Sequence, residues 1–303
     1  MKTAYQDRTI AAVTGADDVL TNALDAGAPG DAARRLRHLA PRLDLRHARE
    51  ASVSEGRAVI IATHATGAAL AVRWFAPGTP TTIHDHGSWG AALVVEGRDR
   101  YERFEQVGAD AAVLDATLWL EPGDVVWWHD PPGDVHRQEG VDDGALELVL
   151  LGTPPPNDGR TFTEADGLGP ARPLVDAMRR AYIDQSFAPL RPHYHDQVIA
   201  DACVPSWRFQ LWGRDDLERL LDREEFGLDE QRLHSFRAVP MADGCVVEVA
   251  VRFRHGTETR LWRDLHVLRC RDAKVVEHLV YCTGHWDAAS IARHGVEANL
   301  VLP

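Results

Sequence analysis

Seven short β-rich segments between Ala51 and Leu151 constrain the fold of this chain more than any other feature of its sequence. Turns rich in Gly, Pro and Asp separate these segments, which span residues 58–63, 68–75, 91–96, 101–105, 112–120, 124–129 and 146–151. Many short strands joined by such turns are typical of a sandwich or barrel. The sequence therefore predicts an all-β barrel, preceded by two helices between Val13 and Leu39, where apolar residues recur at helical spacing.

The pattern changes after a break in the chain. Residues 153–173 are rich in Pro, Gly and polar residues, which indicates a domain boundary. Beyond it we expect helices at 174–182, from Pro192 onwards and at 214–225, then long strands at 232–241, 245–254, 259–270 and 274–282. This order predicts an α+β domain. We therefore expect a first domain over residues 1–155, a linker over 156–171 and a second domain over 172–303.

Composition argues against several classes of partner and location. The formal net charge is −13, whereas nucleic acids and anionic membranes attract basic surfaces, so neither is expected as a partner. No apolar run is long enough for a membrane span or a secretory signal, which predicts a cytoplasmic protein. The four cysteines lie in the second half without a CxxC pair, and we expect them to be reduced.

The strongest functional signal is the motif His84-Asp85-His86. In a strand, residues two apart point to the same side, so His84 and His86 face one point while Asp85 faces away. A third imidazole, His136, follows on a later strand of the same predicted barrel. Three imidazoles can hold one divalent metal and leave positions open for a substrate. The sequence therefore predicts a metal site made of His84, His86 and His136.

The ligand types narrow the chemistry without fixing the metal. Imidazole suits iron, zinc, copper and nickel alike, but adjacent open positions favour Fe(II) with dioxygen as cosubstrate, and Ni, Co or Zn remain alternatives. Neutral ligands leave the full charge on the metal, which favours an anionic substrate group such as a thiolate or carboxylate.

Residues 57–152 resemble the cysteine dioxygenase family of thiol dioxygenases, which are cupins. The matching pieces are Ile83–His86, Trp89–Gly90, Gly97 and Gly133–Arg137. The resemblance implies a jelly-roll barrel that holds iron through His84, His86 and His136. It also implies a small cysteine-like thiol, or related amino acid, as the substrate whose sulfur is oxidised.

The resemblance also suggests how the substrate is held. In the family an arginine before the first strand pair binds the substrate carboxylate, and Arg57 falls at about that place. Arg73, on the segment 68–75, is a rival anchor, since either guanidinium could make a bidentate contact. A surface role is the alternative for each arginine. Trp89 is expected to wall the pocket.

Two departures from the family leave other reactions open. Gly90 stands where the common cupin motif has a glutamate, so no carboxylate ligand is expected. The Ser-His-Tyr relay of the family is absent from the aligned segment, which reads Glu147-Leu-Val-Leu-Leu151. An oxidative rearrangement, decarboxylation or isomerisation of a cysteine-like substrate is therefore an alternative to sulfur oxygenation, and a metal-poor scaffold is another.

Residues 172–303 resemble the cone-shaped SnoaL-like domains related to nuclear transport factor two. The matching pieces are residues 181–185, 194–199, 207–216, 276–281 and 284–287. Strand alternation places Asp264 and His266 on one face, where they could form an acid–base pair in a pocket or a buried hydrogen-bonded pair. Such a domain could also serve as a small-molecule-binding module. Both resemblances imply a homodimer, and their fusion suggests bacterial specialised metabolism.

The remaining histidines are weaker candidates. His193 and His195 repeat the spacing of the metal motif, but their segment is expected to be helical, which would place them on different faces. His64 and His129 have no partner at ligand spacing, so we expect ordinary paired or exposed side chains.

Overall fold

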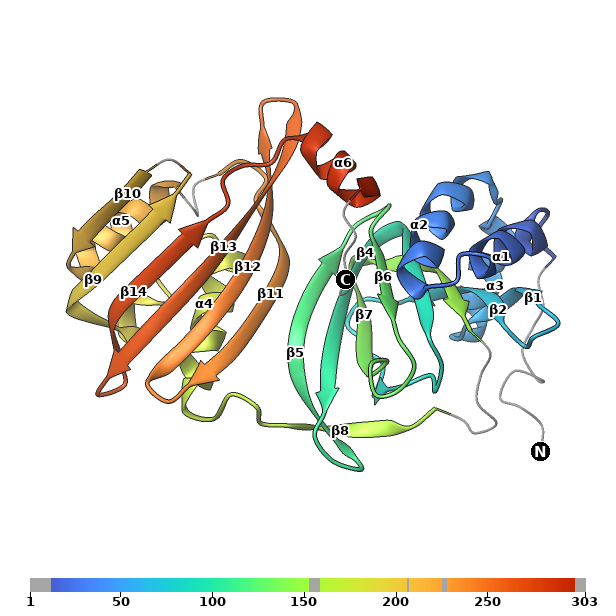
Figure 1. Ribbon diagram of the computed structural model, residues 1–303, viewed down its shortest axis with the longest axis horizontal. Coiled ribbons are helices and arrows are strands. Elements are labelled where there is room, and N and C mark those ends of the chain that lie inside the picture. The colour runs from blue at the N-terminus through green and yellow to red at the C-terminus, as the bar shows by residue number, and fades with distance from the viewer. Residues whose placement is uncertain (1–11, 153–158, 206, 225–227, 298–303) are drawn as a thin grey trace. The chain divides into compact units, whose positions relative to one another are not determined.

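The computed structural model describes residues 12–152, 159–205, 207–224 and 228–297 (Figure 1). The chain divides into two compact units, with the boundary between Ala165 and Asp166, except that Asp115–Thr117 group with the second unit. Within the described ranges, no helix combines the length and the apolar content that crossing a membrane requires. The four cysteines are free thiols.

Three α-helices precede the barrel of the first unit. They are α1 (Ala16–Leu24), α2 (Pro29–Leu39) and α3 (Arg46–Glu55), with the short 3-10 helix η1 (Ala40–Arg42) after α2. The sequence pattern did not predict α3, because its only buried residues are Ala48 and Ser52. The Ser52 hydroxyl donates to the Arg57 carbonyl (2.7 Å) and accepts the Trp74 backbone N–H (2.9 Å). Polar contacts, rather than an apolar stripe, therefore help to hold α3 in place.

The strands of the first unit close into a barrel. They are β1 (Val59–Thr63), β2 (Ala69–Phe75), β3 (Ile83–His84), β4 (Gly90–Gln106), β5 (Ala111–Leu120), β6 (Val125–Trp128), β7 (His136–Leu151) and β8 (Thr161–Ala165). They pair in the order β1-β2-β7-β3-β8-β5, and β4 pairs with β5, β6 and β7. The pairing of β4 with both β5 and β7 completes the ring, as the predicted barrel requires.

Two details differ from the sequence-based expectation. The segments 91–96 and 101–105 belong to one strand, β4, which bends at a bulge beside Gly97 instead of ending there. A Cβ at Gly97 would lie 1.9 Å from the Gly144 carbonyl oxygen, and its φ of 74° also favours glycine. The expected linker contains β8, in which Phe162 is buried and pairs with Ile83.

Strand alternation builds two apolar cores in this unit. Leu146, Leu148 and Leu150 of β7 pack in a cluster with residues of α1, α2 and α3. Val149 and Leu151 of the same strand belong to a separate cluster with Trp128 and Tyr101. One face of β7 therefore packs against the helices, and the other faces the barrel interior.

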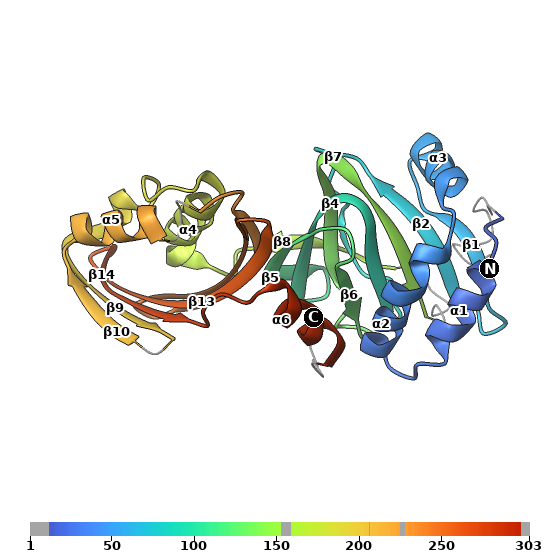
Figure 2. The same cartoon turned by 90° about the horizontal axis from the view of Figure 1, so that it is seen from above.

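The second unit is an α+β fold. Its helices are η2 (Gly169–Ala171), α4 (Arg172–Asp184), η3 (Arg191–His193), α5 (Arg214–Glu224) and α6 (Ala288–Glu297). Its strands are β9 (Tyr194–Val204), β10 (Trp207–Trp212), β11 (Arg232–Met241), β12 (Gly244–His255), β13 (Glu258–Arg271) and β14 (Lys274–Cys282). They follow the order β11-β12-β13-β14-β9-β10, in which β14 and β9 are parallel. Figure 2 shows α4 and α5 on the same face of this curved sheet.

The expectation for the segment after Pro192 was wrong. The four long strands expected after residue 230 are confirmed, but β9 replaces the helix predicted from Pro192 onwards. Val198, Ala200 and Ala202 are buried at alternate positions, which is the period of a strand. His195 is exposed at the start of β9, so the helical argument about this residue does not apply.

Candidate metal centre

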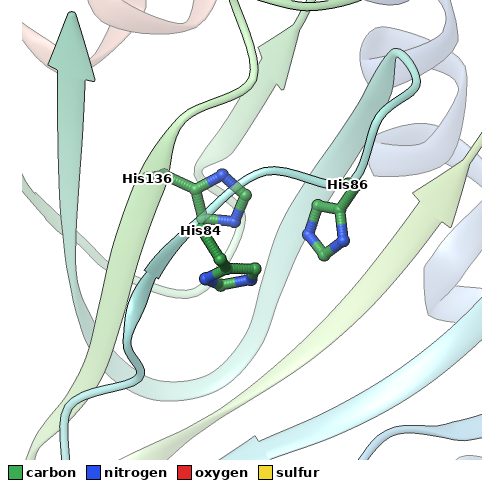
Figure 3. Close-up of side chains that lie close together, drawn as sticks. All are labelled: His84, His86 and His136. Atoms are coloured by element: carbon green, nitrogen blue, oxygen red, sulfur yellow. The ribbon is translucent and has the colours of Figure 1, made fainter. Parts of the chain in front are cut away.

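His84, His86 and His136 converge in the first unit (Figure 3). His84 ends β3, His86 follows two residues later, and His136 begins β7, where it lies opposite His84. Their ring centroids lie 4.7–5.0 Å apart, and one ligand nitrogen from each lies within 4.8 Å of the others. Among the described residues this is the only group of its kind. The first unit is thus compatible with a metal-binding cupin.

Backbone contacts orient two of these imidazoles for metal binding. Nδ1 of His84 lies 2.8 Å from the Thr82 carbonyl oxygen, and Nδ1 of His136 lies 2.8 Å from the Asp134 carbonyl oxygen. A carbonyl only accepts, so Nδ1 carries the proton in each ring and Nε2 keeps its lone pair. Nε2 of His136 is buried without a hydrogen-bond partner among the described residues. A metal ion would satisfy this orphaned atom.

Burial favours the neutral imidazoles that a metal requires. It lowers the pKa of His136 well below its ordinary value, with smaller contributions from His84 and His86. Burial also lowers the pKa of His84, and the nearby positive charge of Arg73 adds to that effect. The site can therefore bind a metal without first losing protons from these two rings at neutral pH.

Two buried aspartates hold the ligand-bearing loop. Asp85 points away from the histidine cluster, as expected, and its Oδ2 accepts a hydrogen bond of 2.8 Å from Nε of Arg160. Asp134 Oδ2 accepts the backbone N–H groups of His86 (3.0 Å) and Gly87 (2.8 Å). Burial, with the nearby charge of Asp85, raises the pKa of Asp134 to about 6. These contacts fix the chain on both sides of the motif.

Trp128 fills the space that a side chain at position 90 would need. A Cβ at Gly90 would lie 2.3 Å from Cζ2 of Trp128 and 2.7 Å from the Leu150 carbonyl oxygen. The Trp128 ring stacks on His86 with centroids 5.6 Å apart, and its indole N–H donates to the Ser88 carbonyl (3.0 Å). The packing therefore leaves no room for the glutamate side chain of the common cupin motif at position 90.

The two candidate anchors lie in different environments. Arg57 sits in the turn between α3 and β1, where it is half exposed and pairs with Glu55 (2.7 Å). This ion pair at the surface favours Arg73 over Arg57 as the anchor, and the role of either arginine stays a prediction. Arg73 lies between Val72 and Trp74 on β2, and both of these pack against the helix-side core, the apolar cluster shared with α1, α2 and α3. Since neighbouring residues of a strand point to opposite sides, Arg73 faces the barrel interior. Its positive charge lowers the pKa of His84, so Arg73 lies near the site.

Trp89 was expected to wall the substrate pocket, and that role stays a prediction. It packs against the helix-side core and lines a surface pocket of about 400 Å³ with Leu24 and Pro29 of the helical segment. Ala91, two residues on, faces the same core, as the alternation of a strand requires. Trp128, which sequence reasoning missed, is the indole beside the ligands.

A buried polar group inside the barrel was also missed. Gln138 donates from its amide to Glu147 Oε2 (2.7 Å) and to Asp99 Oδ2 (3.4 Å). Tyr101, two residues from Asp99 on β4, stacks its ring on His136, with centroids 5.2 Å apart. The sequence signal was Glu147, a charged residue within the apolar run that ends β7.

Asp264 and His266 lie on the buried face of β13 but belong to different arrangements. His266 forms a hydrogen-bonded chain, in which Nε2 lies 2.9 Å from the Tyr182 hydroxyl and Nδ1 lies 2.9 Å from Nε2 of His278. His278 continues to the Tyr194 hydroxyl (3.1 Å). Burial lowers the pKa of His278 to about 3. Both ring nitrogens of His266 are engaged in this chain, so the two residues do not form an acid–base pair.

Asp264 instead lines a cavity of about 600 Å³ in the second unit. Most of the lining is apolar, and it includes Phe209, Leu217 and Val280. Burial raises the pKa of Asp264 to about 6, an effect that the Cys282 and Trp262 side chains partly offset. Its Oδ1 is buried and has no hydrogen-bond partner among the described residues.

The comparisons with solved structures give matches of low sequence identity, and the listed ones concern the fold alone. No family model and no curated protein matches this chain. It is similar to a cupin-like protein from Thermotoga maritima (22% identity, 35% of this chain and 74% of that one, TM-score 0.26). It is similar to an uncharacterised protein with a double-stranded β-helix domain from Klebsiella pneumoniae (16%, 35% and 83%, 0.27). It is also similar to an NTF-2-like protein of unknown function from Burkholderia xenovorans (16%, 43% and 95%, 0.32).

Proposed function

We propose that the first unit is a metal-dependent oxygenase that oxidises the sulfur of a small thiol carrying a carboxylate. The convergence of His84, His86 and His136 supports this proposal most directly. The donor set fits a divalent metal, because two rings present an unprotonated Nε2 and that of His136 is orphaned. When bound, a redox-active metal such as Fe(II) would supply Lewis acidity for the thiol and reactivity toward dioxygen.

The protein's own residues would bind and orient the substrate. Arg73 faces the barrel interior beside His84, where its guanidinium would accept a carboxylate through two parallel hydrogen bonds. Trp128 would hold the His86 ring by stacking and keep a carboxylate ligand out of position 90. A site without an acidic ligand retains its positive charge, which favours a thiolate. In the balanced reaction, one thiol and one dioxygen give one sulfinic acid.

Oxygen uptake tests the proposal. The Fe(II)-loaded protein would be offered cysteine, 3-mercaptopropionate and cysteamine, and the products weighed by mass spectrometry. We expect uptake with a product heavier by two oxygen atoms, and loss of uptake in His86→Ala. A different mass change would instead support oxidative rearrangement, and no uptake with any thiol would contradict the proposal.

The two arginines provide a matched pair of variants. Arg73→Ala should raise KM for cysteine and 3-mercaptopropionate by about tenfold or more, since a charge-assisted pair is lost. It should affect cysteamine, which has no carboxylate, much less. Arg57→Ala should leave all three thiols unaffected, because Arg57 pairs with Glu55 at the surface. Equal effects of the two variants would exclude Arg73 as the anchor.

The cavity of the second unit supports a second candidate function, the binding of a small apolar molecule. An apolar lining with one unpartnered carboxyl oxygen is typical of a ligand pocket. The neutral dye Nile red should bind the full chain and fluoresce. Leu217→Trp, which would fill the cavity, should abolish the signal, and dye binding that this variant leaves unchanged would exclude the cavity.

A further inference from the structure

The barrel interior contains a pair of fully buried carboxyl groups. Asp99 of β4 and Glu147 of β7 are both 0% exposed, and Gln138 between them is 6% exposed. Isolated buried carboxylates are costly, so such groups are normally paired with cations or hold a proton. The hydrogen bonds decide which of these applies here.

The hydrogen bonds of the pair favour a shared proton. The Gln138 amide donates to one oxygen of each carboxyl group, Oδ2 of Asp99 and Oε2 of Glu147. The other oxygens, Oδ1 and Oε1, have no other hydrogen-bond partner among the described residues. The same amide nitrogen of Gln138 lies 2.7 Å from Glu147 and 3.4 Å from Asp99, so the two carboxyl groups lie close together, and only a protonated carboxyl can donate a hydrogen bond to the other. One shared proton therefore satisfies both groups.

The electrostatics agree with this assignment. Burial, followed by the charge of Glu147, raises the pKa of Asp99 well above its usual range. Burial raises the pKa of Glu147 to about 7. Two carboxyl groups that share the Gln138 amide cannot easily both be ionised, so the pair titrates as one unit.

The pair lies close to the proposed metal site along the barrel wall. Gln138 is two residues from His136, and Tyr101, two residues from Asp99, stacks on the His136 ring. Glu147 lies opposite Arg73 in the pairing of β2 with β7. The charges of the pair act on the Tyr101 hydroxyl together with those of Arg103 and Asp134.

We propose that Asp99 and Glu147 form a proton-holding pair whose protonation is linked to the occupancy of the three-histidine site. The pair keeps its shared proton when the site holds no cation. When a divalent metal binds, the pair releases that proton to solvent, so its charge changes from −1 to −2. The second negative charge offsets the charge of the metal, which the neutral imidazole ligands leave in full. This inference rests on the proposed metal site but requires neither iron nor oxygenase activity.

Zinc binding tests the linkage without catalysis. Zn(II) would be titrated calorimetrically into the metal-free full chain at pH 7 in buffers of different ionisation enthalpy, which gives the number of protons released. The wild type should release up to one proton more than Glu147→Gln. The matched control is Glu139→Gln on the same strand, since Glu139 pairs with Arg100 instead. The control should release as many protons as the wild type.

Infrared spectroscopy keeps the test decisive if Glu147→Gln folds poorly. This experiment needs only the wild type, which should show the carbonyl band of a protonated carboxyl group. That band should weaken when Zn(II) binds. Equal proton release by wild type and Glu147→Gln, or a band unchanged by zinc, would overturn the proposal. Zinc binding without oxygenase activity would refute only the proposed reaction.

Discussion

The close packing of Gly90 against Trp128 gives the sharpest prediction. In Gly90→Ala, the new Cβ would lie 2.3 and 2.6 Å from two atoms of the Trp128 ring and 2.7 Å from the backbone oxygen of Leu150. The ring can move, but the backbone oxygen lies within the β4–β7 pairing. Overpacking of this kind costs about 1–3 kcal/mol of the free energy of unfolding. The Trp128 ring also stacks on His86, so its displacement should weaken metal binding.

Urea unfolding, followed by tryptophan fluorescence, measures this cost. The matched control is Gly108→Ala, where the nearest atom to a new Cβ is 3.8 Å away. Both substitutions restrict the unfolded chain, which stabilises by about 0.4–1 kcal/mol, so their difference isolates the steric effect. Gly90→Ala should therefore unfold at a lower urea concentration than Gly108→Ala. Equal midpoints with equal slopes would refute the packing argument.

Three further predictions concern charge and burial. Burial lowers the pKa of His136, so the folded state binds fewer protons than the unfolded state. The metal-free protein should therefore lose stability as pH falls below 6.5. In acid unfolding curves, His136→Gln should show a weaker dependence of stability on pH. Burial raises the pKa of Asp264 from 3.8 to about 6, so the free energy of unfolding of the wild type should fall by about 3 kcal/mol as pH rises through that interval. The free energy of unfolding of Asp264→Asn should not show this fall. Arg160→Ala leaves the carboxylate of Asp85 buried without its guanidinium, which should cost about 1–3 kcal/mol by thermal unfolding; an unchanged melting temperature would exclude a structural role for this pair.

The sequence predicted the elements whose residues alternate clearly and missed those held by polar or distant contacts. The bounds of β11 and β14 agree with expectation, and the buried residues of β12 between them alternate with the period of a strand. Helix α3 was missed because Ser52 anchors it through hydrogen bonds. The polar residues at the start of β9 hid the alternation that follows.

The candidate site shows the same division. The motif His84-Asp85-His86 predicted that two ligands lie close together, and the predicted barrel indicated His136 as the third. The phase of a strand decides whether Arg73 or Trp89 faces the barrel interior, and the resemblance could not fix that phase. Asp99 and Glu147 lie on different strands, so only the folded barrel reveals that they meet.

Metal stoichiometry tests the central claim most directly. The purified chain would be stripped of metal, dialysed anaerobically against Fe(II), Co(II) or Zn(II), and its metal content measured by mass spectrometry beside His136→Ala and His129→Ala. The account predicts one ion per chain in the wild type and in His129→Ala, and none held in His136→Ala. A wild type that holds no metal, or a His136→Ala variant that holds as much as the wild type, would contradict it.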